Sequence, residues 1–376
     1  MPRFFLMVII ALNLFAAFQT KGLEFEWNFN NLKMVIPERE KMREMVKEAQ
    51  NGRVNSPAAY LVENEVQAKK IRQIVELIKN KNGKDSTIDY IRSYWDLFPN
   101  DQQEKLVLLN DIDLLLDQNV INSMTKSDQK IVKELKQDIK KAKYVAENEI
   151  PKVIKENFWG NVKGQNEKSI VVISPLPHLH LSNGVNAKKF SDEIGLIRAF
   201  DKDFYAVSSG IIFAEVLKIM FRDSRIAIGL AFIVLLIMIS IHFKNMKQVL
   251  FVFIGLGSGI LMMLGLMTLF NLKINFYNMI IIPAVMGMGV DNSVHLVHRF
   301  DEFKRESILK ALKTSGGASF MASLTTVLGY SGLCLALHPG LNSIGYMAII
   351  GMGSCMFGSL VILPLLLQLF LKPRVK

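Results

Sequence analysis

An aspartate and two histidines interrupt an otherwise apolar stretch, "PAVMGMGVDNSVHLVHRF", at residues 283–300. His295 follows Asp291 by four residues and His298 by seven, so one helix would present all three on the same face. A carboxylate in the middle of a membrane helix costs about 2.5–3.5 kcal/mol and usually has a function or a partner. We therefore predict that Asp291 is buried within the membrane and exchanges protons, with His295 as the next step and His298 at the interface.

The alternative interpretation is that Asp291 is a structural residue, hydrogen-bonded to neighbouring helices. Hydroxyls nearby bear on this choice, because Thr325 or Thr326 in "MASLTTVLGY" either bonds back to its own helix or reaches a neighbouring carboxylate. Glycines beside the aspartate and in the last apolar run predict close contact between helices. The glycines in question are Gly287, Gly289, Gly351 and Gly353.

The elements that would hold these residues are membrane spans of about twenty residues each. Five are predicted after the polar part of the chain: Ile226–Phe243, Gln248–Phe270, Phe276–His298, Ser319–Leu337 and Ile344–Leu371. The basic connections "HFKNMK" and "HRFDEFKRESILKALKTSG" follow the first and third spans, and the positive-inside rule makes them cytoplasmic. The polar region then lies outside the cytoplasm.

The apolar segment Phe4–Phe18 is either a cleaved signal peptide or a further membrane helix. We favour the helix, because "AAFQT" is a poor cleavage site and a sixth span completes the pattern. The predicted domains are a first transmembrane helix at residues 1–20, an extracytoplasmic domain at 21–222, and a five-helix domain at 223–376. The predicted fold class is an α+β membrane protein with a six-helix half-bundle.

The extracytoplasmic region repeats an order of strand, helix and strand. "SPAAYLVEN", Glu65–Lys81 and "TIDYIRSYWDLF" form the first unit. "KSIVVISPLP", Asn186–Phe200 and "DFYAVSSGI" form the second, and Ile212–Arg222 leads as a helix into the membrane. Two βαβ-type subdomains are therefore predicted, with a helical insertion at about 101–155.

Composition excludes several classes of function. The net charge of +11 does not indicate nucleic-acid binding, because lysines alternate with glutamates and no aromatic and basic motif accompanies them. Cys334 and Cys355 lie in apolar runs and predict neither a disulfide framework nor a metal cluster. His178 and His180 lack a third ligand and are interpreted as polar surface. We expect no enzymatic activity, no cofactor and no metal.

"GMGVDNSVHLVHRF" resembles the signature of the fourth and tenth membrane helices of the resistance-nodulation-division (RND) superfamily, in its MMPL and hopanoid-transporter-like branch. "INFYNMIIIP" before it and "LNSIGYMAIIGMGSCMFGSLVILPLLL" at the end agree in order, as do "LFPNDQQEKLVLLNDI" and "AVSSGIIFAEVLKIMFRDSRIAI". Members of that group are usually about twice this length, and this chain resembles one copy of their repeated half, most closely the second.

The resemblance implies proton-driven export of lipids or other hydrophobic compounds across the cytoplasmic (inner) membrane, with Asp291 as the proton carrier. It also implies a second half, which is either an identical chain or a separately encoded one. Asn292 departs from the tyrosine or phenylalanine that often follows the aspartate, so it joins Asp291, His295, Thr325 and Thr326 in the predicted relay without an assumed tyrosine pairing. The alternatives are a SecD/SecF-like auxiliary of protein secretion and a non-transporting remnant of a split exporter gene.

Overall fold

The computed structural model describes residues 2–49, 56–98, 101–146, 149–156, 158–160, 168–243, 245–303 and 308–371. The chain forms two compact units. Unit 1 comprises residues 1–54, 180–188 and 213–376, and unit 2 comprises residues 55–179 and 189–212. The compact units are therefore not continuous along the chain, and the described residues after α1 belong to the same unit as the apolar helices.

Unit 2 is built on an antiparallel sheet with β4 (Lys168–Pro175) in its centre. β1 (Ala58–Val62) pairs with one edge of β4, and Ala58 lies opposite Ile173. β2 (Ile88–Ser93) pairs with the other edge, and Ile88 lies opposite Pro175. The short β3 (Trp159–Gly160) pairs with the start of β4. α3 (Glu65–Asn82) connects β1 to β2 and buries Ile71 and Val75.

This topology corrects the prediction of two separate βαβ-type subdomains. β1, α3 and β2 form a split βαβ unit, because β4 from the second predicted unit lies between the two strands. β5 (Leu196–Ala199) and β6 (Lys202–Tyr205) form a separate hairpin within the segments predicted as helix and strand. The helix before them, α8, is shorter than predicted and spans Gly184–Ile194.

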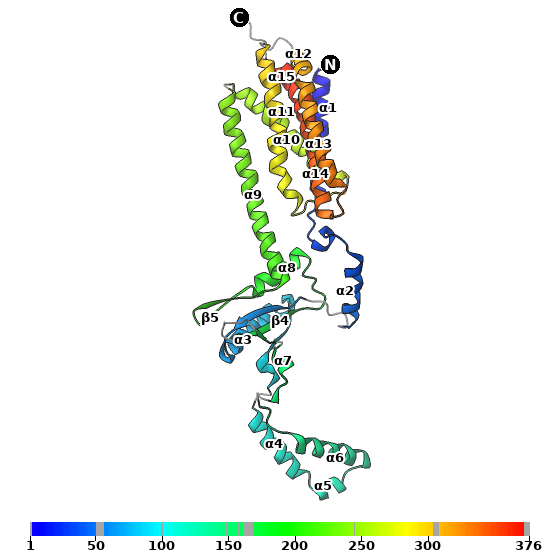
Figure 1. The fold of residues 1–376 in the computed structure, drawn as a ribbon, viewed down its shortest axis with the longest axis vertical. Helices are drawn as coiled ribbons and strands as arrows, with labels where there is room; N and C mark the ends of the chain where they lie inside the picture. The colour runs from blue at the N-terminus through cyan, green and yellow to red at the C-terminus, as the bar shows by residue number, and fades with distance from the viewer. Residues whose placement is uncertain are drawn as a thin grey trace. The chain divides into compact units, whose positions relative to one another are not determined.

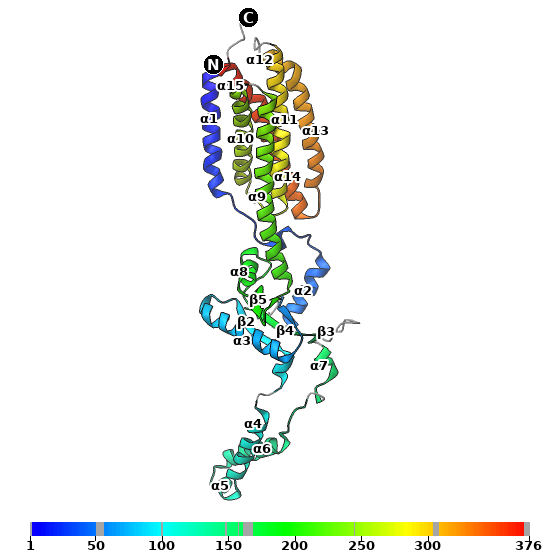
Figure 2. The same ribbon diagram turned by 90° about the vertical axis from the view of Figure 1, so that its left-hand side faces the viewer.

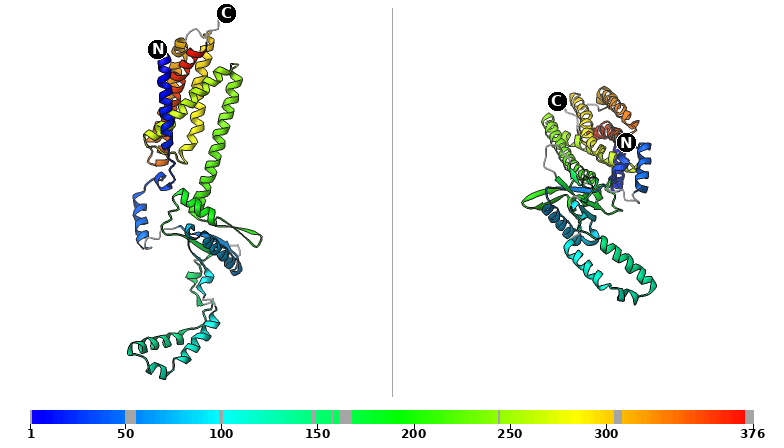
Figure 3. Two further views of the ribbon diagram at one scale, coloured as in Figure 1. Left: turned by 180° about the vertical axis from the view of Figure 1, so that it is seen from behind. Right: turned by 60° about the horizontal axis from the view of Figure 1, so that its bottom comes forward.

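The predicted helical insertion is confirmed as an arm that leaves unit 2 between β2 and β3 (Figure 3, left). Lys136 joins its two long helices, with Nζ 3.1 Å from an Asp113 carboxylate oxygen and 2.7 Å from the carbonyl oxygen of Leu116. Trp159 and Tyr94 stack edge to face where the arm returns to the sheet. The arm consists of α4 (Gln102–Leu115), α5 (Gln118–Asn122), α6 (Lys126–Lys141) and α7 (Lys152–Glu156).

Unit 1 is a bundle of long apolar helices that lie side by side (Figures 1 and 2). Five segments within the described residues are long and apolar enough to span a membrane: Phe4–Gly22, Ser209–His242, Met246–Leu269, Asn278–Glu302 and Pro339–Phe370. The helices of the bundle, with the short α2 and α12, are α1 (Pro2–Gln19), α2 (Pro37–Ala49), α9 (Ser209–His242), α10 (Met246–Leu269), α11 (Ile281–Glu302), α12 (Ile308–Ala311), α13 (Gly317–Cys334), α14 (Pro339–Phe357) and α15 (Leu363–Phe370).

The predicted span at Ser319–Leu337 forms α13, but this helix is not among the five. Its serines, threonines and glycines lower its mean hydropathy relative to the other helices. The last span is continuous through a π-helical turn, Gly358–Ile362, that joins α14 to α15. Among the described residues, five of the six predicted spans therefore meet this criterion of length and apolar composition, and α13 forms as a helix in the sixth position.

Residues 23–32 pack against the connection after α10 and against α9 near Phe221. The Glu26 amide donates to the carbonyl oxygen of Ile274 at 2.8 Å, and the Ile274 amide donates to that of Glu24 at 3.0 Å. Phe25 and Phe221 have ring centroids 4.9 Å apart. These contacts explain why the segment after α1 packs with the bundle.

Candidate functional site

α11 carries the predicted site and is fixed at both ends by side chains. At its start, the Asn275 side-chain oxygen accepts from the Asn278 amide at 3.0 Å, within the turn that leads into the helix. Near its end, the Gln248 amide of α10 donates to Asp301 at 2.6 Å, and Gln248 is only 1% exposed. Asp291 lies about midway between these two anchors, in a helix of 22 residues.

Asp291 lies on the exposed surface of the bundle, so its predicted burial within the membrane does not come from packing inside this chain. Its side chain is 72% exposed and that of His295 is 66% exposed. The buried side of α11 consists instead of residues such as Val285, Val290 and Leu296. The sequence identifies a membrane helix with a carboxylate at its centre, but this pattern does not say which face packs inside one chain.

The predicted alignment of the three polar side chains is confirmed by geometry. His295 Nε2 lies 3.5 Å from Asp291 Oδ1, and His298 Nε2 lies 3.4 Å from Glu302 Oε1 one turn further on. The ring of His298 is also 5.8 Å from that of His242 at the end of α9. Titratable groups thus extend along one face of α11 from mid-helix to its charged end.

Asn292 faces away from this exposed row and into the bundle. Its side-chain amide donates to Ser323 Oγ of α13 at 2.7 Å, and the two residues are 7% and 3% exposed. The threonines predicted to reach a carboxylate do not do so, because Thr325 and Thr326 donate to the carbonyl oxygens of Met321 and Ala322 in their own helix. Ser323 is the hydroxyl that meets α11, and helical phase alone did not identify it.

Two of the four predicted packing glycines make close contacts. A Cβ on Gly289 would lie 2.8 Å from Cys355 Cβ, and one on Gly351 would lie 2.8 Å from Val285 Cγ2. At Gly287 and Gly353 a Cβ would meet nothing within 4 Å. Gly289 and Gly351 therefore bring α11 and α14 together, whereas Gly287 lies on the exposed side with Asp291, one turn before it.

The structure gives no support for a metal site among the described residues. No group of three or more His, Cys, Asp and Glu side chains comes together there. His178 and His180 lie in the turn after β4 and not on the strand that was predicted.

Comparison with known proteins assigns the membrane part of the chain. Residues 194–372 match the family described as protein export membrane protein SecD/SecF, C-terminal. A further similarity is to the hopanoid transporter HpnN of Burkholderia multivorans, at 29% identity over 106 residues, and to that of Rhodopseudomonas palustris, at 28% over 111 residues. The membrane part of the chain is therefore similar to the SecD/SecF family and to the hopanoid transporters.

The segments of these relatives that align with the chain are short compared with the whole proteins. The HpnN alignments cover 28% and 30% of this chain and 11% and 12% of the transporters. Membrane protein MJ1562 of Methanocaldococcus jannaschii is 33% identical over 109 residues, which is 27% of this chain and 28% of the relative. A solved heavy metal efflux pump aligns with 96% of this chain and 46% of its own, at 12% identity and a TM-score of 0.45, and its arrangement is not carried over.

Proposed function

We propose that this chain is one half of an RND-type exporter that uses the proton gradient to move lipids or other hydrophobic compounds out of the cytoplasmic membrane. The observation that carries the proposal is the pair of Asp291 and His295 at the centre of an apolar span. A carboxylate in this position is costly in lipid and is typical of proton pathways. The similarity to hopanoid transporters supports a hydrophobic cargo.

The exposed face of α11 requires a partner. Asp291 facing lipid would cost about 2.5–3.5 kcal/mol, which a second bundle packed on this face would relieve by supplying polar groups. A Cβ added at Gly287 would meet nothing within 4 Å, so this glycine leaves room for the backbone of a second helix on the same face. We propose that a second half covers it, either an identical chain about a twofold axis or a separately encoded half.

Coupling to the exported region would go through α9. This single helix of 34 residues begins in the segment after β6 and ends beside α11, where His242 meets His298. In its most apolar stretch 6% of the residues are buried, so little packing within this chain resists its movement. Protonation of Asp291 would neutralise it, change the packing of the two halves, and shift α9.

The charge distribution supports the orientation that we propose. α1 begins and α15 ends at the same end of the bundle (Figure 1). Arg299, Lys310 and Lys313 follow the mid-part of α11 at the end where the Asp301 and Gln248 contact lies. On the basis of the positive-inside rule we propose that this end is cytoplasmic and that unit 2 lies outside the cytoplasm.

A role in protein secretion is the second candidate, because residues 194–372 match the SecD/SecF family. Depletion in cells separates the two candidates. Loss of lipid export with normal secretion supports the exporter, whereas defective secretion with an unchanged lipid distribution supports the auxiliary role.

The decisive variant is Asp291→Asn, which keeps the size of the side chain and removes its charge. The full chain, purified with any partner that accompanies it, is reconstituted in vesicles with an imposed pH gradient and a fluorescent lipid. We expect gradient-dependent lipid movement to fall to background while assembly is retained. Asp201→Asn, in the exposed turn between β5 and β6, is the matched control. Full gradient-dependent movement in Asp291→Asn contradicts the proposal.

A further inference from the structure

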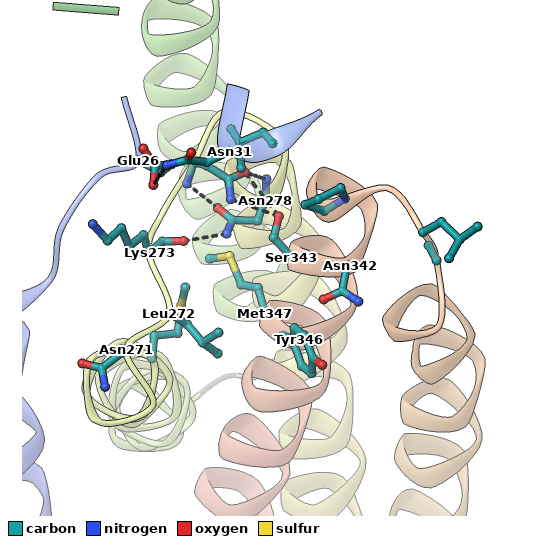
Figure 4. A pocket seen from close by; sticks show the side chains of 16 residues that line it. Glu26, Asn31, Asn271, Leu272, Lys273, Asn278, Asn342, Ser343, Tyr346 and Met347 are labelled. Carbon is teal, nitrogen blue, oxygen red and sulfur yellow. Dashed lines mark hydrogen bonds between the residues drawn. The ribbon is translucent and has the colours of Figure 1, made fainter. Parts of the chain in front are cut away.

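A cavity of about 660 Å³ lies at the end of the bundle opposite the basic connections. Three parts of unit 1 form it: the segment before η2 (Phe29–Leu32), the connection from α10 to α11, and the start of α14 (Figure 4). Its volume is within the range of about 300–1,000 Å³ that is usual for small-molecule sites. Nothing in the proton site described above uses it.

The inner part of the cavity is apolar. Met267 and Met347 are 1% and 0% exposed and line it together with the half-buried Leu272. Figure 4 shows Leu272 and Met347 close together, with polar side chains of the connections around them. A ligand would therefore place a hydrocarbon part against these residues and a polar part toward the asparagines.

Part of the polar wall is a closed hydrogen-bond network that fixes its shape. The Asn275 side-chain amide donates to Ser343 Oγ at 3.0 Å, and the Asn278 side-chain amide donates to the Lys273 carbonyl oxygen at 3.0 Å. Asn275 and Asn278 are 2% and 1% exposed. These side chains use their amide groups in hydrogen bonds within the protein, which fixes their positions in the cavity wall.

The charged groups at the cavity are also committed. Lys273 Nζ lies 2.8 Å from Glu24, and this hydrogen bond and charge hold the pKa of the Glu24 carboxyl below its usual value. Glu26 accepts from the Asn28 amide at 2.8 Å and from the Asn31 side chain at 3.0 Å. The lining thus has one carboxylate and one ammonium group, and the ammonium group already has a partner.

Four neutral side chains of the lining have polar atoms that remain for a ligand in the described part of the chain, and Asn271 is one of them. Asn342 donates its side-chain amide to the Cys334 carbonyl oxygen at 2.6 Å, which leaves its Oδ1 without a hydrogen bond. The Tyr346 hydroxyl and Asn31 Oδ1 have no hydrogen-bond partner in the structure either. Together they offer one hydroxyl, amide acceptors and the side-chain amide donors of Asn271, next to a Glu26 carboxylate that accepts hydrogen bonds from Asn28 and Asn31.

We propose that this cavity binds the head of an uncharged amphiphile that carries hydroxyl groups, with its hydrocarbon chain along Met267 and Met347. Hydroxyls donate to the amide oxygens and exchange hydrogen bonds with Tyr346. An anionic head would meet the Glu26 carboxylate without a free ammonium group. The inference rests on the proposed function in one respect, since it names a class of cargo for the exporter.

The test uses three ligands that have monounsaturated hydrocarbon chains of the same length and differ in their head groups: monooleoylglycerol, oleic acid and oleylamine. Native mass spectrometry of the full chain in nanodiscs measures the retention of each. We expect monooleoylglycerol to be retained best, and Tyr346→Phe to weaken its binding by about three- to tenfold, as the loss of one neutral hydrogen bond requires. Tyr205→Phe, an exposed tyrosine of unit 2, is the matched control and leaves binding unchanged.

Equal retention of the three ligands, preference for either charged one, or a Tyr346→Phe variant that binds like Tyr205→Phe overturns the inference. Asp291→Asn separates this result from the proposed function, because the variant keeps the cavity intact. Binding in Asp291→Asn without gradient-dependent transport supports both proposals. Selective binding in a protein whose transport ignores the gradient supports the cavity alone.

Discussion

Gly289→Ala tests the close contact of α11 and α14 directly. The new Cβ would lie 2.8 Å from Cys355 Cβ and 3.2 Å from Leu256 Cδ1. Carbon atoms normally approach to about 3.5–4.0 Å, so Cys355 would have to move by roughly 0.7–1.2 Å, and its Cβ cannot rotate away from its own helix. Overpacking of this kind costs about 1–3 kcal/mol, whereas alanine gains up to about 1 kcal/mol over glycine in a helix.

Gly287→Ala is the matched control, because the same helix offers open space at that position. The gain in helix propensity is common to both variants and cancels in their difference. We expect the free energy of unfolding of Gly289→Ala to be lower than that of Gly287→Ala by about 1–3 kcal/mol, measured by titration with sodium dodecyl sulfate in mixed micelles. Cys355→Gly should recover part of the loss in the double variant. Equal stabilities of the two alanine variants would refute the packing argument.

Two further predictions concern hydrogen bonds. Ser323→Ala leaves the buried Asn292 amide without its acceptor, so we expect a loss of about 1–3 kcal/mol in the same titration, and Thr325→Ala should stay within about 0.5 kcal/mol of the parent chain; similar effects of both would contradict the role of Ser323. In unit 2, burial alone would raise the pKa of Glu193, but hydrogen bonds from Thr87, Ser86 and Asn82 outweigh burial and hold this pKa below its usual value of 4.5. The stability that ionised Glu193 contributes is therefore present above pH 4.5 and is lost as the pH falls through the lowered pKa. Thermal unfolding of the full chain in an acid series should show this decline, and Glu193→Gln should flatten it; an identical decline in the variant would count against Glu193.

The sequence predicted the elements of the membrane part well, because long apolar runs leave little choice of structure. α9 was expected as a helix that continues from the exported region, and it does so from Ser209 to His242. The spacing of Asp291 and His295 also gave their contact, since residues four apart in a helix are neighbours. The sequence did not predict which face of α11 is buried within the chain, because that depends on which helices pack against each face.

The same limit applies to Ser323 and to the cavity. Ser323, Thr325 and Thr326 lie close together in α13, and only the packing of α13 on α11 singles out Ser323. The cavity needs Glu26 from the segment after α1, Asn278 from the turn before α11 and Asn342 from α14, which are distant in the sequence. In unit 2 the strands β1, β2 and β4 were recognisable, whereas β5 lies in a segment predicted as helix. The pairing of β4 with both β1 and β2 is a long-range property that periodicity does not encode.

The position of β4 also has a consequence for biogenesis. β1 and β2 are synthesised before the whole arm, and they have no strand between them until β4 is made. Closure of the sheet must therefore wait for a strand that is made much later, which is a slow, non-local step. During this interval the edges of β1 and β2 are open to chaperones or to wrong partners, so the length of the arm sets how long the nascent domain stays vulnerable.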